Sequence, residues 1–322
     1  MKQILLILLF VVVVLKSDEY QIGSGIKIPK LNIYVGGYIT ADYIQRRDDY
    51  NRLRIDDIAL ITYGNYKRFS YLSEFEIKDA YFKEWGKKKS EETNTHLKIE
   101  RLYFDYVYSD KLEFRFGKFS TPAGYWNLTP IGALRDSASN PYLAYILYPR
   151  YSTGLQVSYE DHLNSGLAYT MMIQNNDDLD DRYNNILIKQ HSVAGVEHVG
   201  EDISVKANIG YFQTKSTTKF YYFLLSAQYD QPKYQLTAEY GARNKSVPYS
   251  LYVQGVYHIA SKHDIIGRFE NYKIDEGAYR NEKIGVLGYT YRPISPITYK
   301  AEYQLRSYTN ESQLKLSFSI LF

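Results

Sequence analysis

Apolar and polar side chains alternate along most of the chain from Leu31 onward. The last segment shows this most clearly, with apolar residues at Leu314, Leu316, Phe318, Ile320 and Phe322. Successive side chains of a β-strand point to opposite faces, so the alternation gives each strand one apolar and one polar face. Helical periodicity is sustained nowhere, apart from a short turn between Pro130 and Ala138. The pattern therefore predicts an all-β fold.

The alternating segments number about sixteen, although fourteen or eighteen also fit the pattern. They start near residues 31, 53, 66, 98, 111, 151, 165, 186, 202, 219, 232, 246, 262, 280, 295 and 312. Each runs for about 9–12 residues, and short connections alternate with long ones such as 79–97, 119–150 and 175–185. Tight turns at one end and long loops at the other are typical of a transmembrane antiparallel up-and-down β-barrel. A soluble β-sandwich has shorter strands, and a β-solenoid would show a fixed repeat.

Composition supports a β-rich protein at an interface between water and an apolar phase. The chain has 36 Tyr and no Cys, which excludes disulfides, thiolate metal sites and a cysteine nucleophile. Tyrosine favours strands and suits a boundary because its ring is apolar and its tip is polar. The net charge is +3 with Lys and Arg dispersed, which argues against a nucleic-acid partner.

The N-terminus carries a short apolar run from Ile4 to Leu15 after Lys2. Twelve residues are too few for a membrane-spanning helix but fit a secretory signal. We therefore expect a signal peptide over 1–17, a short segment over 18–30 and a barrel over 31–322, with an uncleaved N-terminal anchor as the alternative. No later segment reaches 18 consecutive apolar residues, which excludes a helical membrane transporter.

One stretch carries a family resemblance. Leu112–Asn127 contains Gly117-Lys118-Phe119 followed by Pro122 and Gly124, and resembles Gram-negative outer-membrane porins of the phosphate-selective porin O/P-like group. The terminal Phe322, after alternating apolar residues, resembles the signal that barrel-assembly machinery binds. The resemblance covers 98–150 and the last strand. It implies a sixteen-stranded barrel in the cell outer membrane, a homotrimer, and a third loop folded into the pore; the dense arginine ladder of that group is not visible here.

The resemblance and the pattern together predict a porin, not an enzyme. We expect a water-filled channel for passive diffusion of small hydrophilic solutes and ions, with a weak anion preference and no metal or cofactor. Outer-membrane lipid and lipopolysaccharide would surround it. The connection 119–150 is the candidate constriction, because loops of this length are usually functional. The candidate constriction residues are Arg115, Lys118, Tyr125, Trp126, Arg135, Asp136 and Arg150. A surface loop tethered by a local Arg135–Asp136 pair is the alternative.

Alternation also assigns charged residues to the barrel interior, and of these twelve are basic and eight are acidic. The basic residues are Arg68, Lys78, Arg101, Arg115, Lys189, Lys206, Lys233, Arg268, Lys283, Lys300, Arg306 and Lys315. The acidic residues are Glu74, Glu76, Asp105, Glu113, Glu197, Glu239, Glu270 and Glu302. Of these, we name Arg101, Glu113, Arg268, Lys300, Glu302, Arg306 and Lys315 as candidate lumen-wall residues. The small basic excess is the basis for the expected anion preference.

Three other functions stay open. A substrate-specific channel for phosphate or sugar would share the same barrel. A non-conducting barrel would act as an adhesin or a structural protein. A barrel enzyme would need Ser, His and an acid to converge, but the six histidines show no shared level with such partners. The acidic run 175–182 lacks the glycine and the final glutamate of an EF-hand, so we interpret it as a solvated loop.

Overall fold

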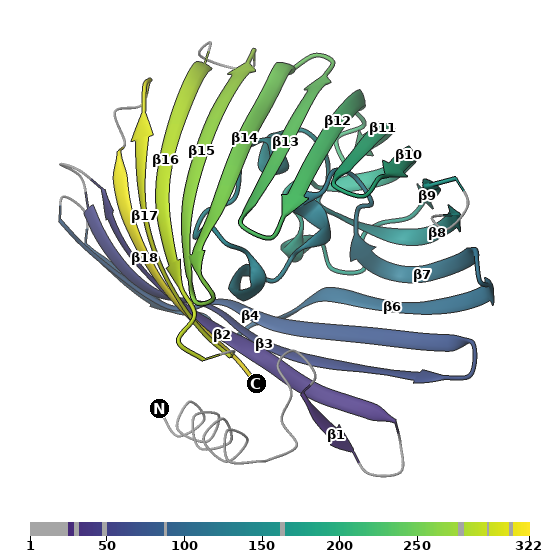
Figure 1. The fold of residues 1–322 in the computed structure, drawn as a ribbon, viewed down its shortest axis with the longest axis horizontal. Helices are drawn as coiled ribbons and strands as arrows, with labels where there is room; N and C mark the ends of the chain where they lie inside the picture. The colour runs from purple at the N-terminus through teal and green to yellow at the C-terminus, as the bar shows by residue number, and fades with distance from the viewer. Residues whose placement is uncertain are drawn as a thin grey trace.

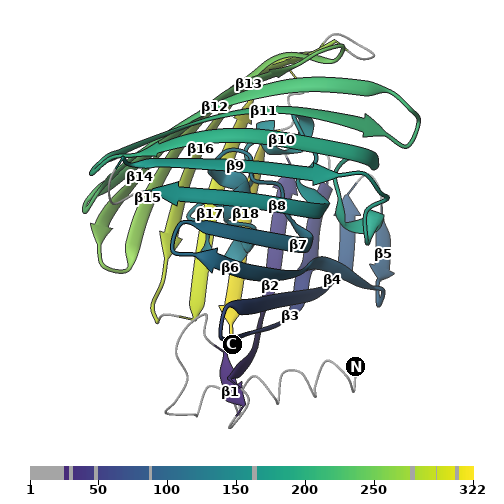
Figure 2. The same ribbon diagram turned by 90° about the vertical axis from the view of Figure 1, so that its right-hand side faces the viewer.

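The computed structural model describes residues 25–28, 32–46, 50–86, 89–161, 165–275, 280–294, 296–308 and 312–322. The predicted signal peptide lies outside the described residues. Sixteen antiparallel strands form a closed wall (Figures 1 and 2). They are β2 (Ile33–Arg46), β3 (Tyr50–Tyr66), β4 (Phe69–Gly86), β6 (Leu97–Ser109), β7 (Leu112–Ser120), β8 (Tyr151–Asp161), β9 (Leu167–Gln174), β10 (Ile188–Val199), β11 (Ile203–Thr214), β12 (Lys219–Gln231), β13 (Tyr234–Arg243), β14 (Val247–Ala260), β15 (His263–Ile274), β16 (Arg280–Tyr291), β17 (Ile297–Arg306) and β18 (Gln313–Leu321).

The predicted sixteen-stranded antiparallel barrel is confirmed, and every predicted strand start lies within three residues of the observed one. Two short strands were not predicted, β1 (Ile26–Ile28) beside β2 and β5 (Ser90–Thr93) beside β4. The predicted strand length was wrong for β3 and β4, which have 17 and 18 residues. Both strands extend beyond their neighbours, and β5 pairs with the far part of β4 between Tyr81 and Glu84.

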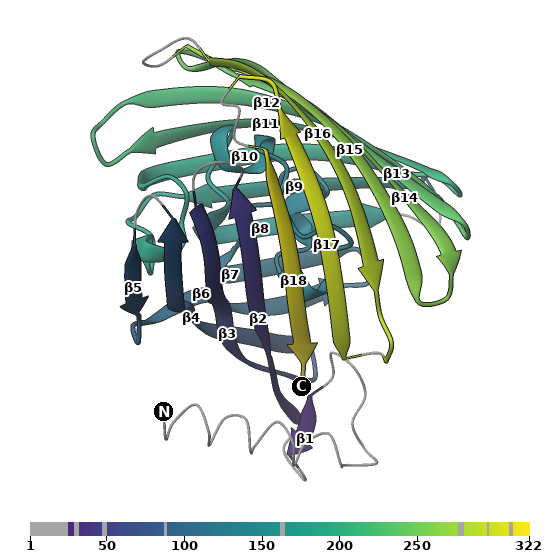
Figure 3. The same ribbon diagram turned by 90° about the vertical axis from the view of Figure 1, so that its left-hand side faces the viewer.

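The seam between the first and last wall strands closes the barrel (Figure 3). Strand β18 pairs with β2 from Gln313↔Arg46 to Leu321↔Tyr38. Beyond β18, the N–H of Phe322 donates to the carbonyl of Gly37 at 2.9 Å, and the N–H of Gly37 donates back at 2.7 Å. A Cβ on Gly37 would lie 2.8 Å from the Phe322 ring and 2.2 Å from the Ala59 carbonyl oxygen. Glycine therefore leaves space for Phe322, whose role as an assembly signal stays a prediction.

Most wall strands have an exposed apolar face and a buried face. In β12, Tyr221, Phe223 and Leu225 are exposed, whereas Tyr222 and Leu224 are buried. An apolar outer surface around a closed sheet is what a hydrocarbon environment stabilises. The predicted interior position was wrong for Lys189 and Lys283, which are exposed in strands, and for Arg68 and Lys233, which are exposed in turns. A bulge in β10 displaces Lys189, and the alternation in β16 buries its neighbour Glu282 instead, because a shift of one residue exchanges the faces.

The connection between β7 and β8, residues 121–150, is enclosed by the wall (Figures 1 and 2). It contains the 3₁₀ turns η1 (Trp126–Leu128) and η2 (Gly132–Leu134) and the one-turn helix α2 (Leu143–Ile146). Among the described residues, no helix is long and apolar enough to cross a membrane.

Apolar residues fasten this segment to one side of the inner wall. Leu143, Leu147 and Tyr148 share a buried cluster with wall residues of β9–β14, which include Met172, Val193, Phe212, Phe220, Tyr222, Leu224 and Tyr252. Burying one such side chain contributes about 1.5–3 kcal/mol. The predicted polar inner face of each strand is therefore absent here, because this part of the inner face is a hydrophobic core between wall and loop.

Candidate functional site

A cavity of about 530 Å³ lies between the 121–150 segment and the inner face of the wall. Its wall side comes mainly from β2, β3, β17 and β18, and its other side comes from the 121–150 segment. Many of its lining residues are charged, and they are Asp42, Arg54, Asp56, Asp57, Lys78, Glu100, Arg135, Arg150, Arg182, Glu270, Lys300, Arg306 and Lys315. Of the predicted constriction residues, the cavity is lined by Arg135 and Arg150.

Three wall glutamates hold the 121–150 segment through its backbone N–H groups. Glu239 on β13 accepts from Tyr125 and Trp126, the latter at 3.2 Å. Glu270 on β15 accepts from Tyr142 at 2.6 Å. Glu302 on β17 accepts from Ala138 at 3.0 Å and Ser139 at 3.2 Å, and also from the Ser139 hydroxyl. A carboxylate bound by N–H groups satisfies amides that a buried loop would otherwise leave unpaired.

Wall cations bind the carbonyl groups of the same segment. Lys300 donates to Gly132 at 2.6 Å, Lys315 donates to Ala138 at 2.8 Å, and Arg268 donates to Ser139 at 3.0 Å. Arg268, Lys300, Glu302 and Lys315 were predicted as lumen-wall residues. All four lie on the inner wall, and all four bind the 121–150 segment.

The lack of a side chain at Gly124 allows the 121–150 segment to lie directly against the wall. Its φ of +68° is a conformation that side chains other than glycine rarely adopt, and a Cβ there would lie 2.5 Å from a carboxylate oxygen of Glu239. The N–H of Gly124 donates to Asn208 on β11 at 3.1 Å. The Pro-x-Gly sequence therefore places a turn directly against the wall.

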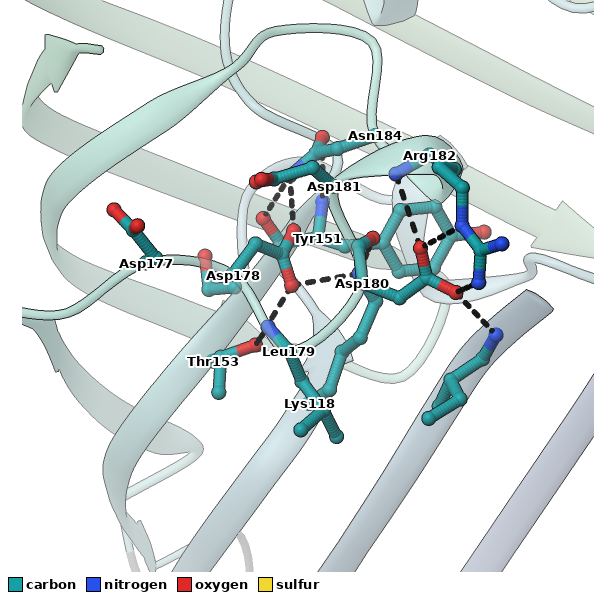
Figure 4. A network of polar contacts seen from close by, with 12 residues as sticks. Lys118, Tyr151, Thr153, Asp177, Asp178, Leu179, Asp180, Asp181, Arg182 and Asn184 are labelled. Carbon is teal, nitrogen blue, oxygen red and sulfur yellow. Dashed lines mark hydrogen bonds and ion pairs between the residues drawn. The ribbon is translucent and has the colours of Figure 1, made fainter.

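A second segment, residues 175–187 between β9 and β10, also docks onto the inner wall (Figure 4). Lys118 donates to the Asp178 carboxylate at 2.6 Å and to the Asp180 carbonyl at 2.8 Å, and both side chains of the Lys118–Asp178 pair are fully buried. Asp178 also accepts from Thr153 at 2.7 Å and from Asn184 at 2.9 Å. These contacts satisfy a charge pair that would be costly to bury alone.

Asp180 fixes the other end of this contact. It accepts from the N–H of Ile99 at 3.0 Å and pairs with Arg182 at 2.8 Å. Burial by itself raises the pKa of Asp180, but the bonds from Arg182 and Ile99 lower it to about 2. The prediction of a solvated acidic loop was wrong for Asp178 and Asp180, because their partners on distant strands are not visible in a local sequence pattern. Arg182, Tyr183, Asn184 and Asn185 of this segment line the cavity.

The other predicted site residues have partners away from the cavity. Arg115 pairs with Asp105 at 2.7 Å and lies 3.7 Å from Glu113, and Arg101 pairs with Glu74 at 2.5 Å. The Trp126 ring contacts Tyr252 in the hydrophobic cluster, and Tyr125 lies beneath Lys206. Asp136 pairs with Arg292 at 2.9 Å, not with Arg135. Arg306 lines the cavity and pairs with Glu282 at 3.5 Å.

Most charges in the cavity neutralise one another. Asp42 pairs with Arg54 and Lys315, each at 2.9 Å, and Asp57 pairs with Lys78 at 3.4 Å. Within the described part of the chain, four charged cavity residues have no ion-pair partner within 4.0 Å, and they are Arg135, Arg150, Lys300 and Glu100. Three unpaired cations against one unpaired carboxylate give the cavity a positive bias.

A Ser–His contact in the wall was not predicted. His191 Nδ1 lies 2.8 Å from the Ser152 hydroxyl, and its Nε2 lies 3.0 Å from the Tyr222 hydroxyl. Ser152 and His191 are completely buried, and no carboxylate of a described residue contacts the ring. A hydrolase would need an accessible serine and an orienting acid. This contact instead connects the wall to Thr121 at the start of the loop, 2.9 Å from Ser152.

No family model matches the sequence, and no curated protein matches it. Solved structures do match over 90% of this chain. A loop-deletion mutant of OmpT, an outer membrane protein of Vibrio cholerae, has 14% identity, a TM-score of 0.65 and 99% of its own chain covered. Salmonella typhi OmpF in complex with daunomycin has 12% identity, a TM-score of 0.65 and 97% coverage. Pseudomonas putida OprB at low pH has 13% identity, a TM-score of 0.64 and 93% coverage. At these identities the likeness establishes the fold. The finer resemblance to the phosphate-selective group stays a prediction.

Proposed function

We propose that this protein is a passive channel of the cell outer membrane for small hydrophilic solutes and ions, with a weak anion preference. The polar cavity of about 530 Å³ beside the docked 121–150 segment is the observation that carries the proposal. A wall that is apolar outside and polar inside suits a barrel that holds water within lipid. The three unpaired cations in the cavity support the direction of the ion preference.

The 121–150 segment, joined by 175–187, narrows this channel. A constriction needs a rigid backbone, because selectivity depends on fixed charges at fixed positions. Hydrogen bonds to β13, β15 and β17 and the hydrophobic cluster on β9–β14 supply that rigidity. Transport through such a channel involves no covalent chemistry, so the protein would not be an enzyme.

The proposal extends to the surroundings of the barrel. The signal peptide would direct export, the barrel-assembly machinery would bind the last strand at Phe322, and outer-membrane lipid with lipopolysaccharide would cover the exposed apolar face. A homotrimer is the expected assembly, and one structural neighbour is described as a trimer form. Chemical crosslinking in detergent, read as a ladder that stops at three copies, tests this part independently.

Single-channel recording in a planar bilayer tests the function itself. Discrete conductance steps, with a reversal potential under a salt gradient that favours anions moderately, are the expected result. Neutralising Arg150 should reduce the anion preference, whereas neutralising Arg115 should change it less, because Arg115 is paired with Asp105. Folded protein that inserts into the bilayer but never conducts would contradict the channel and favour a structural or adhesive barrel.

A further inference from the structure

Two arginines of the 121–150 segment have buried donors with no acceptor. Arg135 donates from Nε to the Thr129 carbonyl at 2.6 Å and also to the Asn140 side chain, but its Nη2 has no partner among the described residues. The side chain of Arg150 contacts ring faces, and its buried Nε has no partner either. Arg135 is only 8% exposed. Burying a donor without an acceptor destabilises the folded protein, and more so when the donor is charged.

These two arginines belong to one arrangement. Arg135 contacts Asn140, whose amide donates to the Tyr145 hydroxyl, and the Arg150 guanidinium lies 5.7 Å from the Tyr145 ring centre. Both arginines line the same cavity. Burial and the charge of Arg150 lower the pKa of Arg135, as expected for two cations held near each other. Two neighbouring guanidinium groups with unused donors can bind an anion, which accepts their hydrogen bonds.

We propose that Arg135 and Arg150 bind the carboxylate of a small organic acid inside the channel. Both guanidinium groups line the cavity without a carboxylate partner within 4.0 Å among the described residues, and the planar arginine fork favours a carboxylate as the bound anion. Tyr145, whose ring lies beside Arg150 and is 42% exposed, offers apolar surface for the carbon skeleton of the ligand. The inference deepens the proposed channel function, because it gives the channel a substrate class.

Binding can be measured without conduction, because Trp126 reports on the site. The Arg135 guanidinium lies 5.2 Å from the Trp126 ring, and the chain has one other tryptophan, Trp85. In a Trp85→Phe background, folded protein in detergent micelles is titrated with gluconate, with neutral glucose of similar size, and with inorganic phosphate. A saturable fluorescence change with gluconate and none with glucose is the expected result.

Two substitutions distinguish binding of gluconate at a defined site from attraction by the overall positive charge of the cavity. Arg150→Gln should weaken gluconate binding about ten-fold or more, because it removes a charge-assisted hydrogen bond to the carboxylate. Arg182→Gln removes a cation from the same cavity, but its side chain is 57% exposed and paired with Asp180, so it should change binding less than about two-fold. Equal weakening by both variants, no saturable response, or tighter binding of phosphate than of gluconate would each overturn the carboxylate site.

A bilayer recording distinguishes this inference from the channel proposal. Gluconate should reduce the wild-type current in a saturable manner, and Arg150→Gln should shift that block by the same factor as the binding. Conduction without gluconate binding would overturn the site and leave the channel function intact. Gluconate binding in micelles by a protein that never conducts would overturn the channel function and leave the site.

Discussion

A charged side chain that faces the interior of this barrel is not therefore available to a solute. Glu302 faces inward, yet its carboxylate oxygens accept from the N–H groups of Ala138 and Ser139. Lys315 faces inward, yet it binds the Ala138 carbonyl and the Asp42 carboxylate. Arg150, by contrast, has neither a carboxylate nor a carbonyl partner among the described residues. The free charges of the cavity are therefore a small subset of its lining, and substitutions should be chosen by partner, not by position alone.

Gly124 is the residue where the loop depends most on having no side chain. Gly124→Ala should destabilise the folded barrel by about 1–3 kcal/mol, because it adds backbone strain at positive φ and displaces the Glu239 carboxylate. Urea unfolding in detergent micelles, followed by tryptophan fluorescence, measures the change. Gly132→Ala is the matched control, because a Cβ at Gly132 meets no atom within 4 Å. Equal destabilisation by the two variants would contradict the role of the turn at Gly124.

Residue-level contacts also mark the limit of prediction from sequence. Period-two alternation reports which face a side chain is on, so the strands and the interior position of Lys300 and Glu302 could be predicted. It does not report what that side chain touches. Glu239 and the Tyr125 N–H are 114 residues apart, and the pairing depends on how the whole barrel closes. The Lys118–Asp178 contact was missed for the same reason, although the isolated Lys118 in a strand-end Gly-Lys-Phe sequence is a signal that could have prompted a search for a buried partner.

At the scale of elements, two connections with different sequences meet at one cavity. The 121–150 segment is bound by a hydrophobic cluster on one side and by wall charges on the other. The 175–187 segment is polar and is bound through the Lys118–Asp178 pair. The two segments contact each other as well, since Asn185 donates to the Tyr145 and Tyr148 carbonyls at 2.9 Å each. Loss of one anchor should therefore loosen one segment before it affects the wall.

The Lys118–Asp178 pair should be the critical anchor of the 175–187 segment. Lys118→Met leaves Asp178 buried without its cation and should destabilise the protein by about 3–5 kcal/mol, and Lys118→Met with Asp178→Asn should recover part of that loss. Urea unfolding midpoints measure both. Lys215→Met is the control, since Lys215 pairs with Asp181 of the same segment but is solvent-exposed, so its loss should change the stability little. A Lys118→Met protein as stable as the Lys215→Met protein would contradict this assignment.

Glu302 should hold the 121–150 segment against the wall. Glu302→Ala removes acceptors for three donors, so the segment should open more often and trypsin should cleave after the buried Arg135 more than about ten-fold faster. Mass spectrometry of limited digests identifies the cut. Glu113→Ala is the control, because Glu113 lies on the wall near Arg115, away from the loop. Unchanged cleavage after Arg135 in the Glu302→Ala protein would show that the hydrophobic cluster alone holds the segment.

At the scale of the whole molecule, the barrel combines two kinds of interior. On the side of β9–β14 the loop and wall form a hydrophobic core, and on the side of β2–β4, β17 and β18 they leave the charged cavity. The outer face is apolar all around, so an apolar phase must cover it, while the inner face holds both a packed core and a polar opening. The proposed conducting path therefore lies on one side of the barrel interior. The electric field along this path depends on the few charges without ion-pair partners.

Glu100 is the unpaired carboxylate of the cavity, so its charge should oppose the field of Arg135, Arg150 and Lys300. Glu100→Gln should increase the anion-to-cation permeability ratio about two-fold, because one charge several ångströms from a permeating ion in water contributes about 0.5 kcal/mol. Lys300→Met should shift the ratio in the opposite direction. The reversal potential across a KCl gradient measures both, and Asp110→Asn at an exposed turn is the control.

The dependence of the permeability ratio on salt concentration distinguishes an electrostatic ion preference from a purely steric one. The Debye length falls from about 10 Å at 0.1 M to about 3 Å at 1 M salt, so a field from a few fixed charges weakens as salt increases. The effect of Glu100→Gln should therefore be largest at 0.1 M and nearly absent at 1 M. A ratio that Glu100→Gln leaves unchanged at 0.1 M, or an effect of the same size at 1 M, would mean that ion preference does not come from the unpaired charges of the cavity. The position of the 121–150 segment would then have to determine the preference through the shape of the opening.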